Sequence, residues 1–128
     1  MTLLQVLLTL VGMDLSQIRK DLAVFARDRD WDRFHSVRNL SLAMVGEVGE
    51  LAELLQWVDD KEISKFLASG GRERLGEELS DILFYLIRLA DIADLDLESA
   101  VKAKFGENSL KYPIEKSKGN AKKYNELG

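Results

Sequence analysis

Residues 39–57, NLSLAMVGEVGELAELLQW, and residues 72–93, RERLGEELSDILFYLIRLADIA, decide the fold of this chain. In both stretches apolar residues recur every three or four positions, which is the period of an amphipathic α-helix. The second stretch keeps this spacing from Leu75 to Leu89. The chain's single proline, Pro113, lies outside both. The sequence therefore predicts an all-α protein built around these two long helices.

Two further helices are predicted, one on each side of this pair. Asp14 is a suitable N-cap for a helix over residues 15–29, and Asp96 for another over 97–110, because an aspartate oxygen can accept from the free N–H groups of a first helical turn. Pro113 prevents the last helix from continuing.

The connections are also visible in the sequence. Residues 30–38, DWDRFHSVR, break the helical period and predict a loop, and residues 59–71 form a second connection with a short helical turn at 63–67. Gly46 and Gly49 lie inside the first long helix, where each costs about 1 kcal/mol relative to alanine. We interpret these two glycines as a sign of close helix–helix packing.

A chain of 128 residues is the size of one domain. We expect the domain over residues 14–113, after an apolar extension at 1–13 and before a basic tail at 114–128. The extension is too short to span a bilayer and has no basic segment of the kind that begins a signal peptide. We expect it to add a helical turn or two that packs on the body or on a partner subunit.

Composition narrows the kind of site and the compartment. The chain has no cysteine, which excludes disulfides and thiolate metal sites and makes the cytoplasm the expected location. Residues 1–101 carry 11 basic and 19 acidic side chains, a net charge of −8, whereas residues 102–128 carry 7 and 3, a net charge of +4. An acidic body suits a metal site, and a basic tail suits either contact with a polyanion or simple solvation.

Two pairs of carboxylates stand at helical spacing, Glu47 with Glu50 and Glu78 with Asp81. Residues three apart share a helix face. Each pair lies beside the apolar stripe of its helix, whereas solvated acids usually lie opposite that stripe. Antiparallel packing of the two helices would bring all four acids together. Four carboxylates without cysteine or a matching histidine make an oxygen-rich site that suits Mg²⁺, with Mn²⁺ as the alternative, and Mg²⁺ usually shares its shell with substrate phosphates. A charged rim without metal is the other interpretation.

Aromatic and basic residues flank these acids in the sequence. Tyr85 shares the acidic stripe, and an aromatic ring beside a metal–phosphate site is what stacking on a nucleobase needs. Single aromatic residues near helix ends are more often part of the core. The other candidates are Trp31, Phe34, His35 and Trp57, together with Lys104, Asn108 and Lys111 on the last predicted helix.

Five runs, in chain order, carry a resemblance to a known family: RDWDRFH, RNLSLAMVGEVGELAELLQW, RERLGEELSDILFYLIRLA, NSLKYP and KKYNEL. They resemble the MazG-like all-α nucleoside triphosphate pyrophosphatases, most closely the dCTP pyrophosphatase branch. The resemblance implies a four-helix-bundle-like fold completed by dimerisation or tetramerisation. It also implies Mg²⁺-dependent hydrolysis of a nucleoside triphosphate to the monophosphate and pyrophosphate.

The resemblance assigns roles to individual residues. Metal ligands would be Glu47, Glu50, Glu78 and Asp81, with Glu50 and Glu47 as catalytic residues. Substrate contacts would come from Trp31, Asp32, Arg33, Phe34, His35, Trp57, Tyr85, Lys104 and Asn108. Two positions depart from the family pattern: Leu22 stands where relatives can carry histidine, and Gly106 where they tend to carry aspartate.

The function predicted from the sequence is therefore a nucleotide pyrophosphohydrolase acting on dCTP or a modified dCTP, in the housekeeping of the nucleotide pool. The expected partners are the nucleotide and further copies of this chain in a homodimer or homotetramer, with no membrane and no nucleic acid. The alternatives are the same chemistry on another standard or damaged deoxynucleotide, or a non-enzymatic helical module whose basic tail binds nucleic acid.

Overall fold

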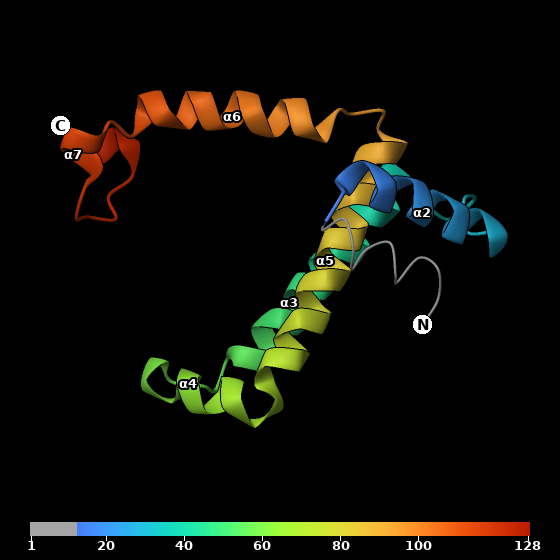
Figure 1. Cartoon of the computed structure of the whole chain (residues 1–128), viewed down its shortest axis with the longest axis horizontal. Coiled ribbons are helices and arrows are strands. Elements are labelled where there is room, and N and C mark those ends of the chain that lie inside the picture. The colour runs from blue at the N-terminus through green and yellow to red at the C-terminus, as the bar shows by residue number, and fades with distance from the viewer. Residues whose placement is uncertain (1–12) are drawn as a thin grey trace. The chain divides into compact units, whose positions relative to one another are not determined.

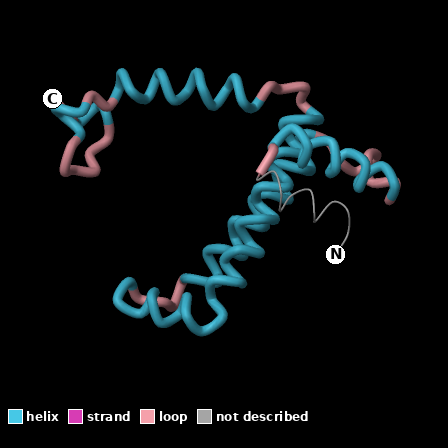
Figure 2. The backbone as a smooth tube through the Cα atoms, viewed as in Figure 1, coloured by secondary structure: helices cyan, strands magenta, loops and turns pink. Residues whose placement is uncertain are grey.

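The computed structural model describes residues 13–128, and this part of the chain is helical without any β-strand (Figures 1 and 2). The α-helices, in chain order, are α2 (Leu15–Asp28), α3 (Val37–Leu55), α4 (Ile63–Phe66), α5 (Arg72–Ile92), α6 (Leu97–Lys111) and α7 (Ile114–Ser117). Short 3₁₀ helices cover Asp60–Glu62 and Tyr124–Glu126, and a turn over Leu67–Gly71, kinked at Ser69 and Gly70, joins α4 to α5. The all-α prediction is confirmed.

The described residues form two compact units, one ending at Asp94 and the other comprising Leu95–Gly128. The predicted domain of residues 14–113 and tail of 114–128 stay predictions. The predicted extension at 1–13 lies outside the described residues except for Met13. Within residues 13–128, the helices lack the combination of length and apolar character that a membrane span requires.

The first unit is built around the packing of α3 against α5, and α2 also packs on α5. The short α4 and its neighbouring turns reverse the chain, so α3 and α5 lie side by side in opposite directions (Figure 1). The reversal needs glycine at two positions. Gly70 has a φ of +90°, and a Cβ on Gly71 would overlap the carbonyl oxygen and the ring of Phe66.

Side-chain caps set the helix starts. Asp14 accepts from the N–H groups of Ser16 and Gln17 at 3.0 and 3.2 Å, and Asp96 accepts from Ser99 N–H at 3.1 Å. Both caps were predicted. Helix α3 begins two residues earlier than expected because Ser36 serves as its N-cap, accepting from Asn39 N–H at 3.0 Å.

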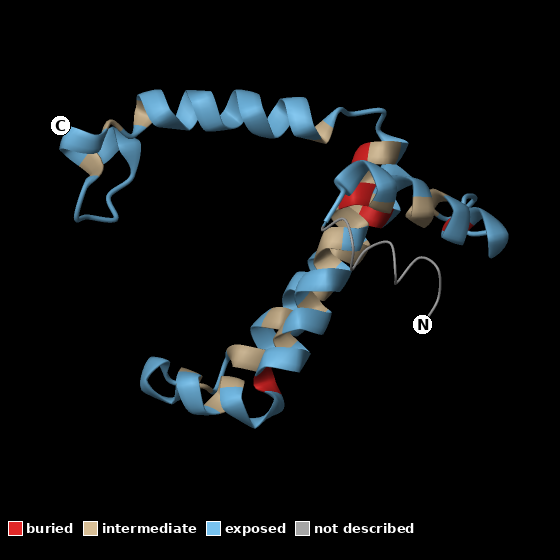
Figure 3. Cartoon of the chain, in the orientation of Figure 1, coloured by how far each residue is buried: buried red, intermediate tan, exposed pale blue. Residues whose placement is uncertain are grey.

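The buried core of the described residues is small. Its apolar members are Ala26, Leu40, Ile87 and Ala90, and Figure 3 shows most of them gathered at one end of the α3–α5 pair. Val48 and Leu79, both placed on the core stripes by their spacing, are instead about half exposed, at 47% and 49%. The stripes therefore extend well beyond the part that this chain buries.

The predicted close packing at Gly46 and Gly49 is wrong for the described residues. A Cβ built on either glycine would have no heavy atom within 4 Å, apart from its immediate helical neighbours. Both glycines instead border open space on α3, next to the acidic residues of that helix.

Candidate functional site

Three carboxylates from two helices converge in the first unit. Glu47 and Glu50 lie on α3 and Glu78 on α5, and one oxygen from each lies within 4.8 Å of the other two. The three come together because α3 and α5 run antiparallel and each presents its acidic pair beside the contact face. Asp81, one turn beyond Glu78, is not part of this group, but it borders the same cavity as Glu47.

Two of these carboxylates have a buried oxygen with no polar partner to offset its loss of solvent. Glu47 and Glu78 are half-buried, and the Oε2 atom of each is buried without a hydrogen-bond partner among residues 13–128. Loss of solvent raises the pKa of Glu47, and the negative charges of Glu50 and Asp81 raise it further. The pKa of Glu78 is also raised, first by loss of solvent and then by the charge of Glu50. Both shifts disfavour the ionised forms.

A bound divalent cation would offset both the loss of solvent and the repulsion among the negative charges. Oxygen-only ligand sets suit hard cations such as Mg²⁺ and Mn²⁺. The two orphaned oxygens of Glu47 and Glu78 are free to act as ligands, and the exposed Glu50 completes a set of three. These residues therefore fit a divalent cation on the basis of donor chemistry and unsatisfied atoms.

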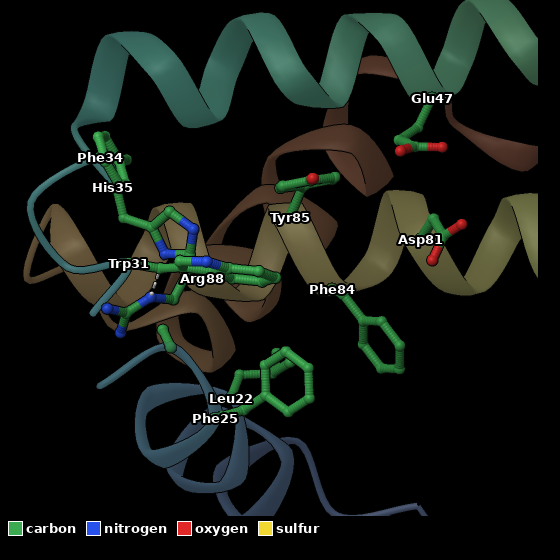
Figure 4. A pocket seen from close by; sticks show the side chains of 11 residues that line it. Leu22, Phe25, Trp31, Phe34, His35, Glu47, Asp81, Phe84, Tyr85 and Arg88 are labelled. Carbon is green, nitrogen blue, oxygen red and sulfur yellow. Dashed lines mark hydrogen bonds between the residues drawn. The ribbon is translucent and has the colours of Figure 1, made fainter. Parts of the chain in front are cut away.

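A cavity of about 560 Å³ begins at Glu47 and Asp81 and extends away from them between α2, α5 and the loop before α3 (Figure 4). Its size lies within the usual range for small-molecule sites. Its walls are mostly apolar or aromatic, with carboxylates at one end and a guanidinium at the other. The lining residues are Leu22, Phe25, Ala26, Trp31, Phe34, His35, Glu47, Asp81, Phe84, Tyr85 and Arg88.

The loop between α2 and α3 supplies three of these aromatic residues. Its path is set by backbone hydrogen bonds: Trp31 N–H donates to Ala26 O at 2.9 Å, and the N–H groups of Phe34 and His35 donate to Trp31 O at 2.8 and 3.1 Å. The ring of Trp31 packs edge-to-face against Phe25 with centroids 5.7 Å apart. The predicted aromatic loop is thus folded as a wall of the cavity.

Arg88 closes the cavity opposite the carboxylates. It is 7% exposed, and each of its three nitrogens donates one hydrogen bond. Nε donates to Nδ1 of His35 at 3.2 Å, Nη2 to Oδ1 of Asp32 at 2.7 Å, and Nη1 to Oδ2 of Asp91 at 3.2 Å. Arg19 on α2 donates to the other oxygen of Asp91 at 3.1 Å. The network ties the aromatic loop to α5 and α2.

The same neighbours act on the titration of His35. Partial burial lowers the pKa of its imidazole, and the positive charge of Arg88 lowers it further, against the opposing effect of Asp32. Burial and Arg88 therefore both disfavour the charged imidazolium of His35.

Three predicted substrate residues of the first unit do not line the cavity: Asp32, Arg33 and Trp57. Asp32 instead accepts the hydrogen bond from Arg88. Arg33 pairs with Asp30 at 3.2 Å and stacks over the ring of Phe34, with 4.8 Å between its Cζ and the ring centroid. Trp57 follows the end of α3 and is 88% exposed. Their substrate contacts stay predictions.

Lys104 and Asn108 belong to the second unit, on α6. The Nζ of Lys104 lies 3.2 Å from Glu107, and the carbonyl of Asn108 accepts from Tyr112 N–H at 2.9 Å. Lys111 also pairs with Glu107, at 2.7 Å. The roles of Lys104 and Asn108 toward substrate stay predictions as well.

The sequence-based candidates did not include Arg88 or Phe84, nor the α2 residues Phe25 and Ala26. Arg88 had a signal, since it continues the stripe of Glu78, Asp81 and Tyr85 along α5. No signal in the sequence marked the contribution of α2, because an apolar stripe has the same residue pattern whether it covers a core or a cavity. Leu22, the departure from the family pattern, lines the cavity from this helix.

Comparison with known proteins supplies the family. The model of the MazG-like family matches residues 43–127, which include both acidic pairs. The chain belongs to the MazG-like family. The dCTP pyrophosphatase 1 of Bos taurus is 52% identical over 115 residues, covering 88% of this chain and 68% of that protein. The dCTP pyrophosphatase 1 of Homo sapiens is 47% identical over 114 residues, covering 88% and 67%.

A solved structure agrees with the family assignment. A pyrophosphatase from Archaeoglobus fulgidus superposes on this MazG-like chain with a TM-score of 0.72 at 33% identity, covering 77% of this chain and 92% of that one. The predicted resemblance to MazG-like proteins, on the branch that holds the dCTP pyrophosphatases, is confirmed.

Proposed function

We propose that this chain is a nucleotide pyrophosphohydrolase that uses Mg²⁺ to convert dCTP to dCMP and pyrophosphate. One observation carries the proposal: three carboxylate oxygens from two helices lie within 4.8 Å of one another beside a cavity whose remaining walls are largely aromatic. A nucleoside triphosphate matches these two parts of the site. Its polyanionic end needs a cation, and its flat base stacks on aromatic rings.

Glu47, Glu50 and Glu78 would hold the cation. When bound, Mg²⁺ neutralises charge on the phosphates and lowers the pKa of a water molecule. Glu47 and Glu78 are half-buried, and each has a buried oxygen with no competing partner among residues 13–128, which suits them to hold a ligand in fixed geometry. Glu50 is exposed, so its carboxylate is the one that solvent reaches most easily. We assign two roles to Glu50: it orients the water that attacks the α-phosphorus, and it accepts a proton from that water.

The aromatic side chains would hold the nucleoside. Tyr85 lies one helical turn from Asp81, and it lines the cavity together with Trp31 and Phe34 (Figure 4). Their rings exclude water from the base and set the distance between base and phosphates. Asp81 borders the junction between the two ends of the cavity, where it can assist the cation or orient the phosphate chain.

The substrate is proposed as dCTP because the curated relatives carry that name at about half identity. A modified dCTP, or another standard or damaged deoxynucleotide, is the alternative within the same chemistry. Leu22 bears on this choice, since it offers an apolar contact at a position where relatives can carry histidine.

Assembly into a homodimer or homotetramer belongs to the same proposal, as does a cytoplasmic location. The support for assembly is the exposed apolar stripe on α3, where Leu42, Val45 and Val48 recur every three residues and are 57%, 64% and 47% exposed. A surface of this kind is typical of a protein–protein contact.

The test is pyrophosphate release from a panel of nucleoside triphosphates, with Mg²⁺ and with a chelator. We expect release from dCTP with Mg²⁺, loss of release with chelator, and at least a hundredfold lower rate for Glu50→Gln. Glu53→Gln is the matched control, because Glu53 is an exposed glutamate on the same helix outside the carboxylate group. Undiminished release by Glu50→Gln would refute the mechanism, and release from none of the nucleotides would refute the function.

A further inference from the structure

The hydrogen bond between Arg88 and His35 determines where the proton of His35 resides. A guanidinium keeps all its protons in proteins and can only donate. Arg88 Nε–H points at Nδ1 of His35, with 3.2 Å between the two nitrogens. Nδ1 must therefore be the bare, accepting nitrogen. A neutral imidazole carries one proton, so that proton lies on Nε2.

The arrangement around this bond is rigid. Arg88 is 7% exposed, and Asp32 and Asp91 hold its other two nitrogens at 2.7 and 3.2 Å. Asp32 and His35 belong to the same loop, so two of the three bonds of Arg88 fix that loop. The guanidinium cannot turn away from His35 without breaking bonds to both carboxylates.

The other side of the imidazole faces the cavity. His35 borders the cavity, and a dashed line in Figure 4 joins its ring to Arg88. Among residues 13–128 no group forms a hydrogen bond with Nε2, so its N–H is available to a ligand. A ligand that meets Nε2–H must present an acceptor, such as a carbonyl oxygen or a bare ring nitrogen.

We propose that Arg88 is a positioning residue that locks His35 as the neutral Nε2–H tautomer, so that His35 donates a hydrogen bond to an acceptor on the bound nucleoside. The tautomer lock depends only on the geometry of the chain, whereas its use in recognition rests on the proposed function. Cytosine carries two acceptors, its carbonyl oxygen and its unprotonated ring nitrogen, either of which could receive this bond.

The first test is an NMR measurement on the free protein. His35 is the only histidine in the chain, so the imidazole ¹⁵N and ¹³C signals need no assignment. At a pH where the ring is neutral, we expect a protonated Nε2 and a bare Nδ1 in a single tautomer. The Arg88→Met variant should show a mixture of tautomers, and the Arg19→Gln variant should keep the lock because Arg19 contacts Asp91 but not His35. A protonated Nδ1 in the wild-type chain, or an unchanged tautomer in Arg88→Met, would overturn the proposal.

The second test is kinetic. We expect Arg88→Met to raise the KM for dCTP about two- to tenfold, the usual worth of one hydrogen bond, with a smaller change in kcat. In a His35→Leu background, the same substitution should have a smaller effect on KM, because only the effect on the loop through Asp32 then remains. Equal effects in both backgrounds would overturn the role in recognition. The NMR result stands apart from activity, so a failed lock and a failed proposed function give different outcomes.

Discussion

Replacing Glu47 with glutamine should stabilise the chain when no divalent cation is present and destabilise it relative to wild type when one is. Glu47 takes part in two of the three carboxylate pairings in the site, since oxygens of Glu47, Glu50 and Glu78 lie within 4.8 Å of one another. Two unit charges 4.8 Å apart repel by about 0.9 kcal/mol at the dielectric constant of water. The glutamine variant without cation should therefore gain roughly 1 kcal/mol through the lost repulsion with Glu50 alone, or roughly 4–8 °C in Tm for a unit of this size.

The cation reverses the order of the two proteins. A ligand present at 100 times its Kd stabilises the folded state by about 2.7 kcal/mol. For wild type this corresponds to a rise in Tm of roughly 10–20 °C. The Glu47→Gln variant loses one of the two orphaned buried oxygens that suit the cation, so its rise should be much smaller.

The effect without cation also depends on pH. The pKa values of Glu47 and Glu78 are raised in the folded state, so these two carboxylates bind protons more tightly in the folded chain than in the unfolded chain. Their contribution to stability is full below the ordinary pKa of glutamate and is lost as the pH rises through the raised values. We expect the chelated wild type to lose stability over that interval, and Glu47→Gln to lose less.

Thermal unfolding measured by circular dichroism, with chelator and with Mg²⁺ at several pH values, tests all three statements. Glu53→Gln serves as the control, since it removes a glutamate charge from the same helix without touching the cluster. A chelated Glu47→Gln variant that melts below wild type, or a variant that responds to Mg²⁺ as wild type does, would refute the reasoning.

Three further predictions follow from other parts of the chain. Ile87→Ala should lower the free energy of unfolding by about 2–5 kcal/mol in urea titration, because Ile87 is only 3% exposed in a small core; a loss below 1 kcal/mol would contradict its place in that core. Trp57→Ala should change stability by less than about 0.5 kcal/mol, because Trp57 is 88% exposed, but should raise the KM for dCTP through loss of its predicted substrate contact; an unchanged KM would contradict that contact. Leu42→Asp combined with Val45→Asp should lower the oligomeric state seen by light scattering; an unchanged mass would exclude this face of α3 as the subunit contact.

Helix starts could be predicted wherever a capping side chain was recognised. Asp14 and Asp96 were assigned correctly because a cap acts on the next two or three N–H groups, which is a local rule. Ser36 performs the same function for α3, but its place in a run of charged and aromatic residues was interpreted as loop. The short α7 and the 3₁₀ turn at 124–126 were not predicted, because a single turn is too short to show a period.

The convergence of acids could also be anticipated, since helical spacing fixes which side chains share a face. What spacing cannot give is the offset of one helix along the other. Glu47, Glu50 and Glu78 meet at that offset, while Asp81 reaches the cavity instead. The same limit explains why the prediction of close packing at Gly46 failed. What lies beside this glycine depends on tertiary packing, and the structure shows open space there.

The stripe along α5 explains why one site serves both ends of the proposed substrate. Glu78, Asp81, Tyr85 and Arg88 follow one another at intervals of three or four residues, so they lie along one face of the helix. At 1.5 Å per residue, the ten steps from Glu78 to Arg88 span about 15 Å. Over that distance the face passes from an acid that suits a cation, through a carboxylate and a phenol ring, to a guanidinium that fixes the aromatic loop. Because a single helix carries all four, its geometry sets the distance between the proposed phosphate end and the proposed base end of the site. If the proposed function holds, a change in how the base is bound should therefore also shift the reacting phosphate.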